Sequence, residues 1–423
     1  MKKLTIIAAA FAALAADAAI TITGVTARQR WPWNSLVDVD FTISGAAAGE
    51  AFAIDINAEY AGGDKKLAAY TYTTEPVVAG SATHRLTWNM GKDYPNFRAE
   101  DLRVSVTATP FSSTTPVYMV IDFSGGKDAT TYPVRYTTTP PSHVQGAANE
   151  PCQTTEMWLR RIKAGSFKFC SNDSRPDGYF KVNLTKDFYM GIFECTQQQL
   201  ANLTGTWPSY FSNETYRASR PADTIGGSLG TLYGSTTWSV TNTPAKTSLI
   251  GMVRSKAGLD TFDLPTEAQW EYASRCGYDG TRNPGYTFDT SHVRYDVSST
   301  GMDYANADVS TGTAYVGSFD PSPWGLYDIF GNVWETTRDY SENVTPLQTY
   351  YAEKMDPVPD PITATSVVVD DPIGTTTKSY KRVFRGGAWA SSLGNLTHDT
   401  RSNPDNQNAP AGRRGVRFCV TCE

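Results

Sequence analysis

Residues 20–136 alternate between apolar and polar side chains in the two-residue period of β-strands. Successive side chains of a strand point to opposite faces, so each run buries one face and exposes the other. The clearest runs are Val37–Ile43, Phe52–Ala58, Val104–Ala108 and Met119–Phe123. We therefore predict an immunoglobulin-like β-sandwich over residues 19–136, with a topology that the pattern leaves open.

A short segment rich in proline and small polar residues then interrupts the alternation. Residues 137–150 read Thr-Thr-Thr-Pro-Pro-Ser-His-Val-Gln-Gly-Ala-Ala-Asn-Glu. Paired prolines favour extended polyproline II backbone, so we predict a linker between two folding units. The second unit then spans residues 151–423. A chain of 423 residues is long enough for both units to have a core of their own.

The second unit shows three helix signals and much irregular sequence. The predicted helices cover residues 196–203, 248–257 and 266–275. The first and last begin with a capping box, Thr196 with Gln199 and Thr266 with Gln269. Beyond Gly277 glycine, proline and aromatic residues dominate. Long ordered loops of this kind need ions, disulfides or a function to hold them, and the whole chain is predicted to be β-rich.

The first 18 residues have the pattern of a secretory signal peptide. Lys2 and Lys3 precede an apolar run from Leu4 to Ala16, and small residues suitable for cleavage follow. The run is shorter than the roughly 20 apolar residues that a membrane-spanning helix needs. We expect export to the periplasm, the cell surface or the medium, with cleavage after Ala18 and no transmembrane segment.

Charge and cysteine spacing exclude two classes of function. A formal net charge of −6 gives no long-range attraction to phosphate backbones, so nucleic acid is not an expected partner. Export permits disulfides among the six cysteines. Their spacing lacks the paired CxxC halves of a structural zinc site, so zinc is not expected.

Residues 324–335 concentrate aromatic, glycine and acidic residues in one short stretch. Asp328 and Glu335 flank Gly331, which permits a sharp backbone turn. Both carboxylates, together with backbone carbonyls near the turn, can converge on a hard cation such as calcium. The alternative is a turn before a core strand, with Val333 and Trp334 as packing residues and both acids in solvent.

Six sequence blocks occur in an order typical of one family. They are residues 162–167, 187–197, 264–273, 324–335, 385–389 and 415–418. Together they resemble the formylglycine-generating enzymes, or sulfatase-modifying factor domains, over about residues 152–420. The resemblance implies an α+β, C-type-lectin-like fold with few helices, long loops and structural calcium. It assigns Asp328 and Glu335 as side-chain ligands, and Gly331 and Val333 as carbonyl ligands.

The resemblance also indicates that the oxidase chemistry of the family is lost. Those enzymes bind copper with two cysteines just after the Gly-Gly-aromatic motif, because soft thiolates suit copper(I). Here Ser391 and Leu396 stand at about those positions. Iron enzymes on the same fold need three histidines, and this unit has only His292 and His398. We therefore expect no copper and no catalytic residues of either type.

A binding role is the remaining hypothesis. The chain also resembles variable proteins of diversity-generating retroelements, whose variable positions lie between a Gly-Gly-x-Trp block and a terminal Gly-Phe-Arg. Residues 390–414 have a suitable short polar composition. The alternative is a polar loop whose groups are satisfied internally. The predicted ligand-binding residues are Trp389, Ser391, Ser392, Asn395, His398, Asp399 and Asn403.

The resemblance further suggests disulfide pairs. It places the strand that ends at Cys419 near the end of the helix that follows Thr266, which pairs Cys276 with Cys419. Cys152 with Cys422 would then join the ends of the unit. The two remaining cysteines, at positions 170 and 195, pair or stay thiols.

The resulting hypothesis is an exported two-domain protein whose second domain is a non-catalytic scaffold for a protein or glycan ligand. One alternative is an oxidoreductase of the formylglycine-generating type with an altered site, for which Cys170 and Cys195 are the candidates. Another is a structural subunit of the cell envelope or of an appendage. No sugar-specific motif occurs in the sequence.

Overall fold

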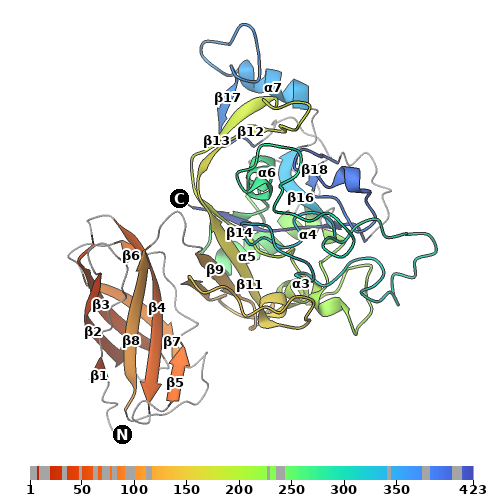
Figure 1. The fold of residues 1–423 in the computed structure, drawn as a ribbon. Coiled ribbons are helices and arrows are strands. Elements are labelled where there is room, and N and C mark those ends of the chain that lie inside the picture. The colour runs from red at the N-terminus through yellow and green to blue at the C-terminus, as the bar shows by residue number, and fades with distance from the viewer. Residues whose placement is uncertain are drawn as a thin grey trace. The chain divides into compact units, whose positions relative to one another are not determined.

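The chain folds into two compact units (Figure 1). The N-terminal unit consists of Met1–Asp122 and Pro133–Pro140, and the C-terminal unit of Phe123–Tyr132 and Pro141–Glu423. The computed structural model describes residues 7–8, 20–30, 36–46, 50–60, 65–68, 77–78, 83–90, 101–110, 117–225, 229–234, 243–340, 344–373, 382–402 and 412–422. Each unit is described by itself below.

Two sheets and a hairpin form the N-terminal unit. The first sheet has the order β2-β3-β7, with β2 (Thr21–Gln29), β3 (Leu36–Ser44) and β7 (His84–Asn89). The second has the order β1-β8-β4-β5, with β6 also paired to β4: β1 (Ile7–Ala8), β4 (Ala51–Tyr60), β5 (Lys65–Ala68), β6 (Val77–Val78) and β8 (Arg103–Pro110). The hairpin pairs β9 (Tyr118–Asp122) with β10 (Val134–Thr137).

The predicted alternation sets the core of this unit. Phe41 of β3, Ile54 of β4 and Val106 of β8 are buried, and they belong to one apolar cluster that takes residues from both sheets. The intervening Asp40 lies on the polar face of β3, where it pairs with Arg85. The β-rich class is thus confirmed, whereas the immunoglobulin-like type stays a prediction. Of the predicted signal peptide only Ile7–Ala8 is described, as β1, and the rest lies outside the described residues.

Three small sheets organise the C-terminal unit. One has the order β11-β14-β20-β15, another β12-β13-β17, and the third β18-β16-β19. Their strands are β11 (Glu156–Ile162), β12 (Gly165–Phe169), β13 (Phe180–Leu184), β14 (Phe188–Gly191), β15 (Phe262–Asp263), β16 (Trp334–Tyr340), β17 (Val368–Asp370), β18 (Arg382–Arg385), β19 (Arg414–Gly415) and β20 (Cys419–Thr421).

The three predicted helices are confirmed. The side chains of Thr196 and Thr266 each accept a hydrogen bond from the backbone amide of the third helical residue, which is a glutamine in both helices. The side chain of that glutamine accepts a hydrogen bond from the backbone amide of the threonine. Gly258 ends the second helix in the left-handed conformation. The helices of this unit are α2 (Pro151–Thr154), α3 (Gln197–Thr204), α4 (Leu229–Tyr233), α5 (Leu249–Ala257), α6 (Glu267–Arg275) and α7 (Val344–Ala352), with short 3-10 turns η2 (Arg217–Ser219) and η4 (Leu393–Asn395).

Helix α6 occupies the centre of this unit. It contacts β12, β13, β16 and β18, and it lies beside β16 and β18 in Figure 1. Its Trp270 is fully buried, as are the carboxylates Glu267 and Glu271. A helix that buries acids as well as an indole needs cationic partners on the strands around it.

The boundary between the units falls within the predicted linker, but the linker is only partly a connector. Pro141–Glu150 belongs to the C-terminal unit, where the His143 side chain is 3% exposed. Phe123–Tyr132, between β9 and β10, also belongs to this unit, and the Tyr132 amide donates to the Lys256 carbonyl at 2.9 Å. Sequence composition missed both attachments.

All six cysteines are free thiols, so the expected disulfides are not formed. Cys276 caps the C-terminal end of α6, whereas the Cys419 thiol contacts Gln269 near the start of the same helix. Seven residues of helix separate these two points by roughly 10 Å. The resemblance identified the correct helix but the wrong end of it. The same finding removes Cys152–Cys422 as a pair.

In the part of the chain that the structure describes, no helix is both long and apolar enough to cross a membrane.

Candidate functional site

Residues 324–333 form a tight turn that leads directly into β16, whose first two residues are Trp334 and Glu335. Asp328, Gly331 and Asn332 all have positive φ angles, of 52°, 85° and 51°. A side chain at Gly331 would collide with the Arg294 carbonyl at 2.4 Å, so glycine is required there. The Gly331 amide donates to the Gly386 carbonyl at 2.9 Å, which ties the turn to the end of β18.

The two acids predicted to bind calcium are both buried, in or directly after this turn. Asp328 accepts a hydrogen bond from the Gly317 amide at 2.7 Å through Oδ2. Glu335 accepts from Trp270 Nε1 at 2.7 Å and forms a two-pronged ion pair with Arg417, with Nη2 to Oε1 at 2.6 Å. The alternative that left both acids in solvent is therefore wrong, because their exposed fractions are 5% and 0%.

A third buried acid, Glu194, completes this cluster. It accepts from Asn332 Nδ2 at 2.7 Å and from the Val333 amide at 3.0 Å, and so holds the turn in shape. Burial, together with the charges of Asp328 and Glu335, raises the pKa of Glu194 well above its ordinary value. Sequence analysis included Glu194 in a family block but gave it no role.

The donor set fits a cation at Asp328 better than at Glu335. Three buried carboxylates share this region with one guanidinium, that of Arg417, which leaves excess negative charge. Burial raises the pKa of Asp328 to about 6. A cation beside Asp328 would relieve this charge. Both oxygens of Glu335 already accept bonds from Arg417 or Trp270, so this acid has little capacity left for a metal.

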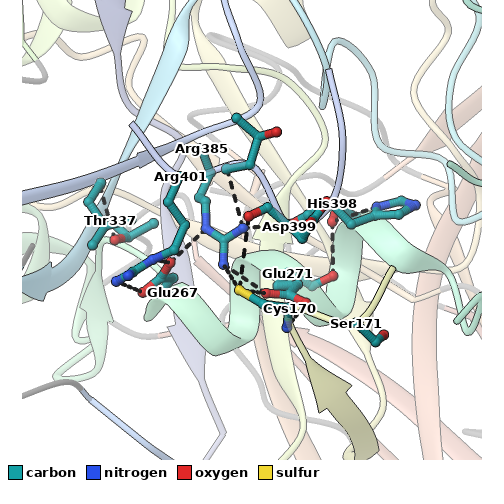
Figure 2. A network of polar contacts seen from close by, with 12 residues as sticks. Cys170, Ser171, Glu267, Glu271, Thr337, Arg385, His398, Asp399 and Arg401 are labelled. Atoms are coloured by element: carbon teal, nitrogen blue, oxygen red, sulfur yellow. Dashed lines mark hydrogen bonds and ion pairs between the residues drawn. The ribbon is translucent and has the colours of Figure 1, made fainter. Parts of the chain in front are cut away.

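A second buried network lies between α6, β18 and the segment after Leu396, as Figure 2 shows. Arg385 bridges the two acids of α6, with Nε to Glu267 at 2.8 Å and Nη2 to Glu271 at 2.7 Å. Its Nη1 donates to the His398 carbonyl at 2.6 Å. Arg401 donates to the second oxygen of Glu267 at 2.8 Å. The guanidiniums thereby anchor the 398–401 segment to α6.

In this network the guanidiniums of Arg275, Arg385 and Arg401 outnumber the carboxylates of Glu267 and Glu271. Burial opposes ionisation of Glu267, but Arg401 and Arg385 outweigh it and lower the pKa of Glu267. Arg275 adds a third guanidinium, whose Nη2 lies 2.6 Å from Glu271. The Cys170 thiol lies between Glu271 and Arg385, at 3.5 and 3.6 Å. A single buried thiol held by an acid and a guanidinium is not the thiolate pair that copper requires.

Two of the seven predicted ligand-binding residues, Trp389 and His398, are fully buried. Trp389 is fully buried, and its Nε1 donates to the Gly412 carbonyl at 2.7 Å. His398 is also fully buried, and its ring packs against Phe330. Burial and the nearby charges of Arg275 and Arg385 lower the pKa of His398 to about 3, so the imidazole is neutral. These residues hold the segment in place and offer nothing to a ligand outside.

Of the remaining predicted ligand-binding residues, some are in contact with the rest of the unit and others are exposed to solvent. Ser391 is buried, and Asp399 is partly buried, accepting from Asn172 Nδ2 at 2.6 Å. Ser392 and Asn395 are exposed, around the short turn η4. Asn403 lies outside the described residues. The predicted surface therefore narrows to the neighbourhood of Ser392 and Asn395.

Comparison with known proteins identifies the family. The family described as "Sulfatase-modifying factor enzyme 1-like domain" matches residues 144–421. The chain belongs to this family. The match begins after the N-terminal sheets, so the family covers the C-terminal unit alone.

Several curated proteins are similar to this member of the sulfatase-modifying factor family over part of its length. Formylglycine-generating enzyme from Thermomonospora curvata is 41% identical over 86 residues, which are 18% of this chain and 27% of that protein. Its counterpart from Streptomyces coelicolor is 34% identical over 149 residues, 33% and 38% of the two chains. Serine/threonine-protein kinase pkn1 from Chlamydia pneumoniae is 31% identical over 153 residues, 36% and 20%. The chain thus spans well under half of these relatives.

The comparison with solved structures found partial matches. Treponema denticola variable protein 1 has a TM-score of 0.44 at 20% identity, covering 67% of this chain and all of that one. PvdO from Pseudomonas aeruginosa has a TM-score of 0.40 at 20% identity, covering 66% of this chain and all of that one.

The two positions at which the resemblance places the family's thiolates, Ser391 and Leu396, are both buried in the fold. The Ser391 hydroxyl accepts a hydrogen bond from the Ala388 amide at 2.9 Å and so closes a turn. Leu396 is fully buried in the main apolar cluster, and its side chain fills the space beside Gly387. A hydroxyl and a hydrocarbon cannot supply the soft ligands of a copper(I) site.

Proposed function

We propose that this chain is an exported binding protein, in which the sulfatase-modifying factor unit is a non-catalytic scaffold for a protein or glycan ligand. The proposal is supported by the buried Ser391 and Leu396, neither of which is a thiol, at the positions where the resemblance places the two thiolates. An oxidase of this family without thiolates would have no means of holding its metal. Export rests on the predicted signal peptide of residues 1–18.

The scaffold reading also agrees with how rigidly the segment after β18 is held. Arg385 and Arg401 anchor it to Glu267 and Glu271 by buried ion pairs. A fixed backbone lowers the entropy that exposed side chains lose when a ligand binds. Ser392 and Asn395, exposed on such a support, have the short polar side chains that exchange hydrogen bonds with varied partners.

One relative supports protein binding in particular. A chaperone protein, LppX, from Paenibacillus barcinonensis is 27% identical over 220 residues, which are 46% of this chain and 75% of that protein. Because the name of this relative describes a chaperone, it favours a protein partner for this chain. The kinase relative matches over too small a share of its length to suggest its own activity here.

Structural calcium belongs to the same proposal. We infer that a calcium ion beside Asp328, supported by carbonyls of Gly331 and Val333, neutralises the excess negative charge of the turn. The turn would then be held by an ion in addition to Glu194. Glu335 is paired with Arg417, so it would attract the calcium ion by its charge and would not bind it directly.

A direct test asks whether the protein oxidises cysteine. The purified chain is incubated with copper(I), oxygen and a cysteine-containing peptide of the sulfatase type, and the peptide is examined for an aldehyde by mass spectrometry. We expect no aldehyde, and no tight copper binding. Aldehyde formation by the natural sequence would overturn the proposal in favour of an oxidoreductase with an altered site.

The double variant Ser391→Cys with Leu396→Cys is the matched comparison. Both side chains lie beside the Gly387–Ala388 peptide, so two thiols there would face one space. We expect this variant to bind copper(I), which would locate the lost site.

Ligand binding is tested on glycan and peptide arrays. Asn395→Arg should abolish any signal, whereas Gln145→Arg, another exposed amide, should not. Equal binding by both variants would place the ligand elsewhere, and the absence of any ligand would favour a structural subunit.

A further inference from the structure

Three metal-ligating side chains meet at the start of the C-terminal unit, next to the turn that holds Asp328 but with none of its carboxylates among them. The ligand atoms of His143, Glu150 and Cys152 all lie within 4.8 Å of one another. Within the described residues this is the one group of three such side chains close enough to share an ion. The His143 and Glu150 side chains are 3% and 17% exposed, and Cys152 is 3% exposed. Surface acids brought together by chance would be far more exposed.

The hydrogen bonds of His143 require a cation or an extra proton at its Nδ1. Its Nε2 lies 3.0 Å from the Gly317 carbonyl, which can only accept, so Nε2 carries a hydrogen. A neutral imidazole with its hydrogen on Nε2 has a lone pair on Nδ1. That nitrogen is in contact with Glu150 Oε2, another acceptor when ionised. Either a proton or a metal ion must lie between the two.

Cys152 shares the same carboxylate oxygen. Its Sγ lies 3.9 Å from Glu150 Oε2, so imidazole and thiol converge on one atom of Glu150. Burial, followed by the charges of Glu150 and Glu156, raises the pKa of this thiol to about 12. The site therefore combines one imidazole, one carboxylate and one thiol whose proton a metal ion would replace.

The three side chains are fixed before any ion arrives. The other oxygen of Glu150, Oε1, accepts from the Val144 amide at 3.0 Å. Gln153 Nε2 donates to the Ala147 carbonyl at 3.0 Å and to the Val316 carbonyl at 2.9 Å, which ties the loop to the rest of the unit.

The imidazole is equally well held. The His143 ring packs edge-on against Phe193 and Tyr327, at 5.0 and 5.3 Å between centroids. The bond from Nε2 to the Gly317 carbonyl is the outer-shell partner typical of metal-bound histidine, because it fixes both the tautomer and the ring.

We propose that His143 Nδ1, the Glu150 carboxylate and Cys152 Sγ bind one divalent ion of the zinc class. Zinc takes nitrogen, oxygen and thiolate ligands in a tetrahedron, and at its usual bond lengths the ligand atoms lie about 3.3–3.8 Å apart. The Sγ–Oε2 separation is close to this range. His143 Nδ1 and Glu150 Oε2 must separate by roughly 1 Å, which a small rotation of the carboxylate provides. The fourth position would hold water.

This site has a structural consequence that does not depend on the proposed binding function. His143 and Glu150 come from the segment 141–150, and Cys152 from α2. One ion would therefore fasten this segment to the first helix of the C-terminal unit. The sequence spacing, His-x6-Glu-x-Cys, matches none of the paired CxxC patterns by which zinc sites are usually found, and so it gave no signal.

The test uses the full chain without a histidine tag, stripped of metal with a chelator. Zn²⁺ is titrated in competition with a chromophoric chelator, and Co²⁺ is substituted to reveal thiolate-to-cobalt charge-transfer absorption. We expect one Zn²⁺ per chain and a charge-transfer band. Cys152→Ala should remove the band, and His143→Gln should weaken Zn²⁺ binding at least about tenfold.

Matched controls use groups of the same chemistry elsewhere. Cys422→Ala removes a partly exposed thiol elsewhere, and His292→Gln an exposed histidine; both should keep the band and the affinity. The proposal is overturned if the natural chain binds no Zn²⁺ and shows no band. It is also overturned if Cys422→Ala removes the band instead, or if Cys152→Ala and His143→Gln bind as the natural chain does. Circular dichroism in chelator identifies a variant that has not folded, and the cobalt spectrum of the natural chain then decides.

Discussion

The two units place their charges in opposite ways. In the N-terminal unit Arg85 pairs with Asp40 on the polar face of the sheet, where half of the Arg85 side chain is exposed. In the C-terminal unit Arg385 pairs with Glu271 where both side chains are 0% exposed. A surface pair is screened by water and contributes little, whereas a buried pair must stay complete because a lone buried charge is strongly unfavourable. The first unit depends on apolar alternation, and the second on an intact set of ion pairs.

The largest expected effect comes from breaking the buried network. Arg385→Met removes one of the two guanidiniums that pair with each of Glu267 and Glu271, leaving only Arg401 and Arg275, and should lower the free energy of unfolding by about 3–5 kcal/mol. Arg85→Met removes an arginine–carboxylate pair of similar length from the surface and should cost a small fraction of that. Urea unfolding followed by tryptophan fluorescence measures both. Equal losses would show that the two units do not differ in this respect.

Backbone shape is the next difference to test, since the C-terminal unit relies on a turn that the alternating strands do not need. Gly331→Ala meets both a φ of 85° and a collision with the Arg294 carbonyl, and should cost about 3 kcal/mol. Gly258→Ala has a similar φ of 69° but open space, and should cost about 1 kcal/mol. Thermal unfolding of both variants checks the gap. If the two variants unfold at the same temperature, the strain of a positive φ accounts for the whole loss of stability and the collision adds nothing.

Calcium should stabilise the C-terminal unit and leave the N-terminal unit unchanged. At a free calcium concentration one hundred times the dissociation constant, the stabilisation would be about 2.7 kcal/mol. Asp328→Ala should remove it, while Asp320→Ala, an exposed acid nearby in the sequence, should not. The comparison is made by thermal unfolding with and without calcium. A calcium effect that survives Asp328→Ala would place the ion elsewhere.

The smallest expected effect near neutral pH is a difference in acid sensitivity, and this effect grows as the pH falls. The folded pKa of His398 is about 3 and the ordinary value is 6.5, so below pH 6.5 the unfolded chain takes up a proton that the folded chain refuses. Stability should therefore fall with pH by at most about 1.4 kcal/mol per unit down to about pH 3, relative to His398→Gln. The N-terminal unit should lose stability only at a lower pH, because the Arg30 hydrogen bond lowers the pKa of Asp38 below its ordinary value of 3.8. Unfolding curves of the natural chain and of His398→Gln between pH 4 and 7 make the comparison. The same dependence of stability on pH in both proteins would contradict the prediction.

Local sequence signals predicted much of the fold. Thr266 with Gln269 defined the start of α6, and the alternation through Phe41 and Ile54 identified buried strand faces. Both signals act over a few residues, because capping and strand periodicity are properties of neighbouring positions. The family blocks predicted a domain over about residues 152–420, and the family match covers residues 144–421.

The candidate site was harder to predict because its contacts span long stretches of chain. Arg385 and Glu271 are 114 positions apart, and neither residue type indicates burial. His398 and Trp389 have the composition of a binding loop, yet both lie inside, because the guanidinium of Arg385 holds that segment against α6. His143 was assigned to a linker on composition, which carries no information about what a segment packs against.

The attachment of Phe123–Tyr132 to the C-terminal unit limits how the protein can be divided. This decapeptide is covalently enclosed by β9 and β10, which belong to the other unit. Cleavage at any single peptide bond therefore yields at least one fragment that lacks a segment of its own unit. A fragment starting at residue 141 would lose the bond from Tyr132 to Lys256, and one starting at 151 would also lose His143. Limited proteolysis should yield nicked but associated chains rather than two independent domains.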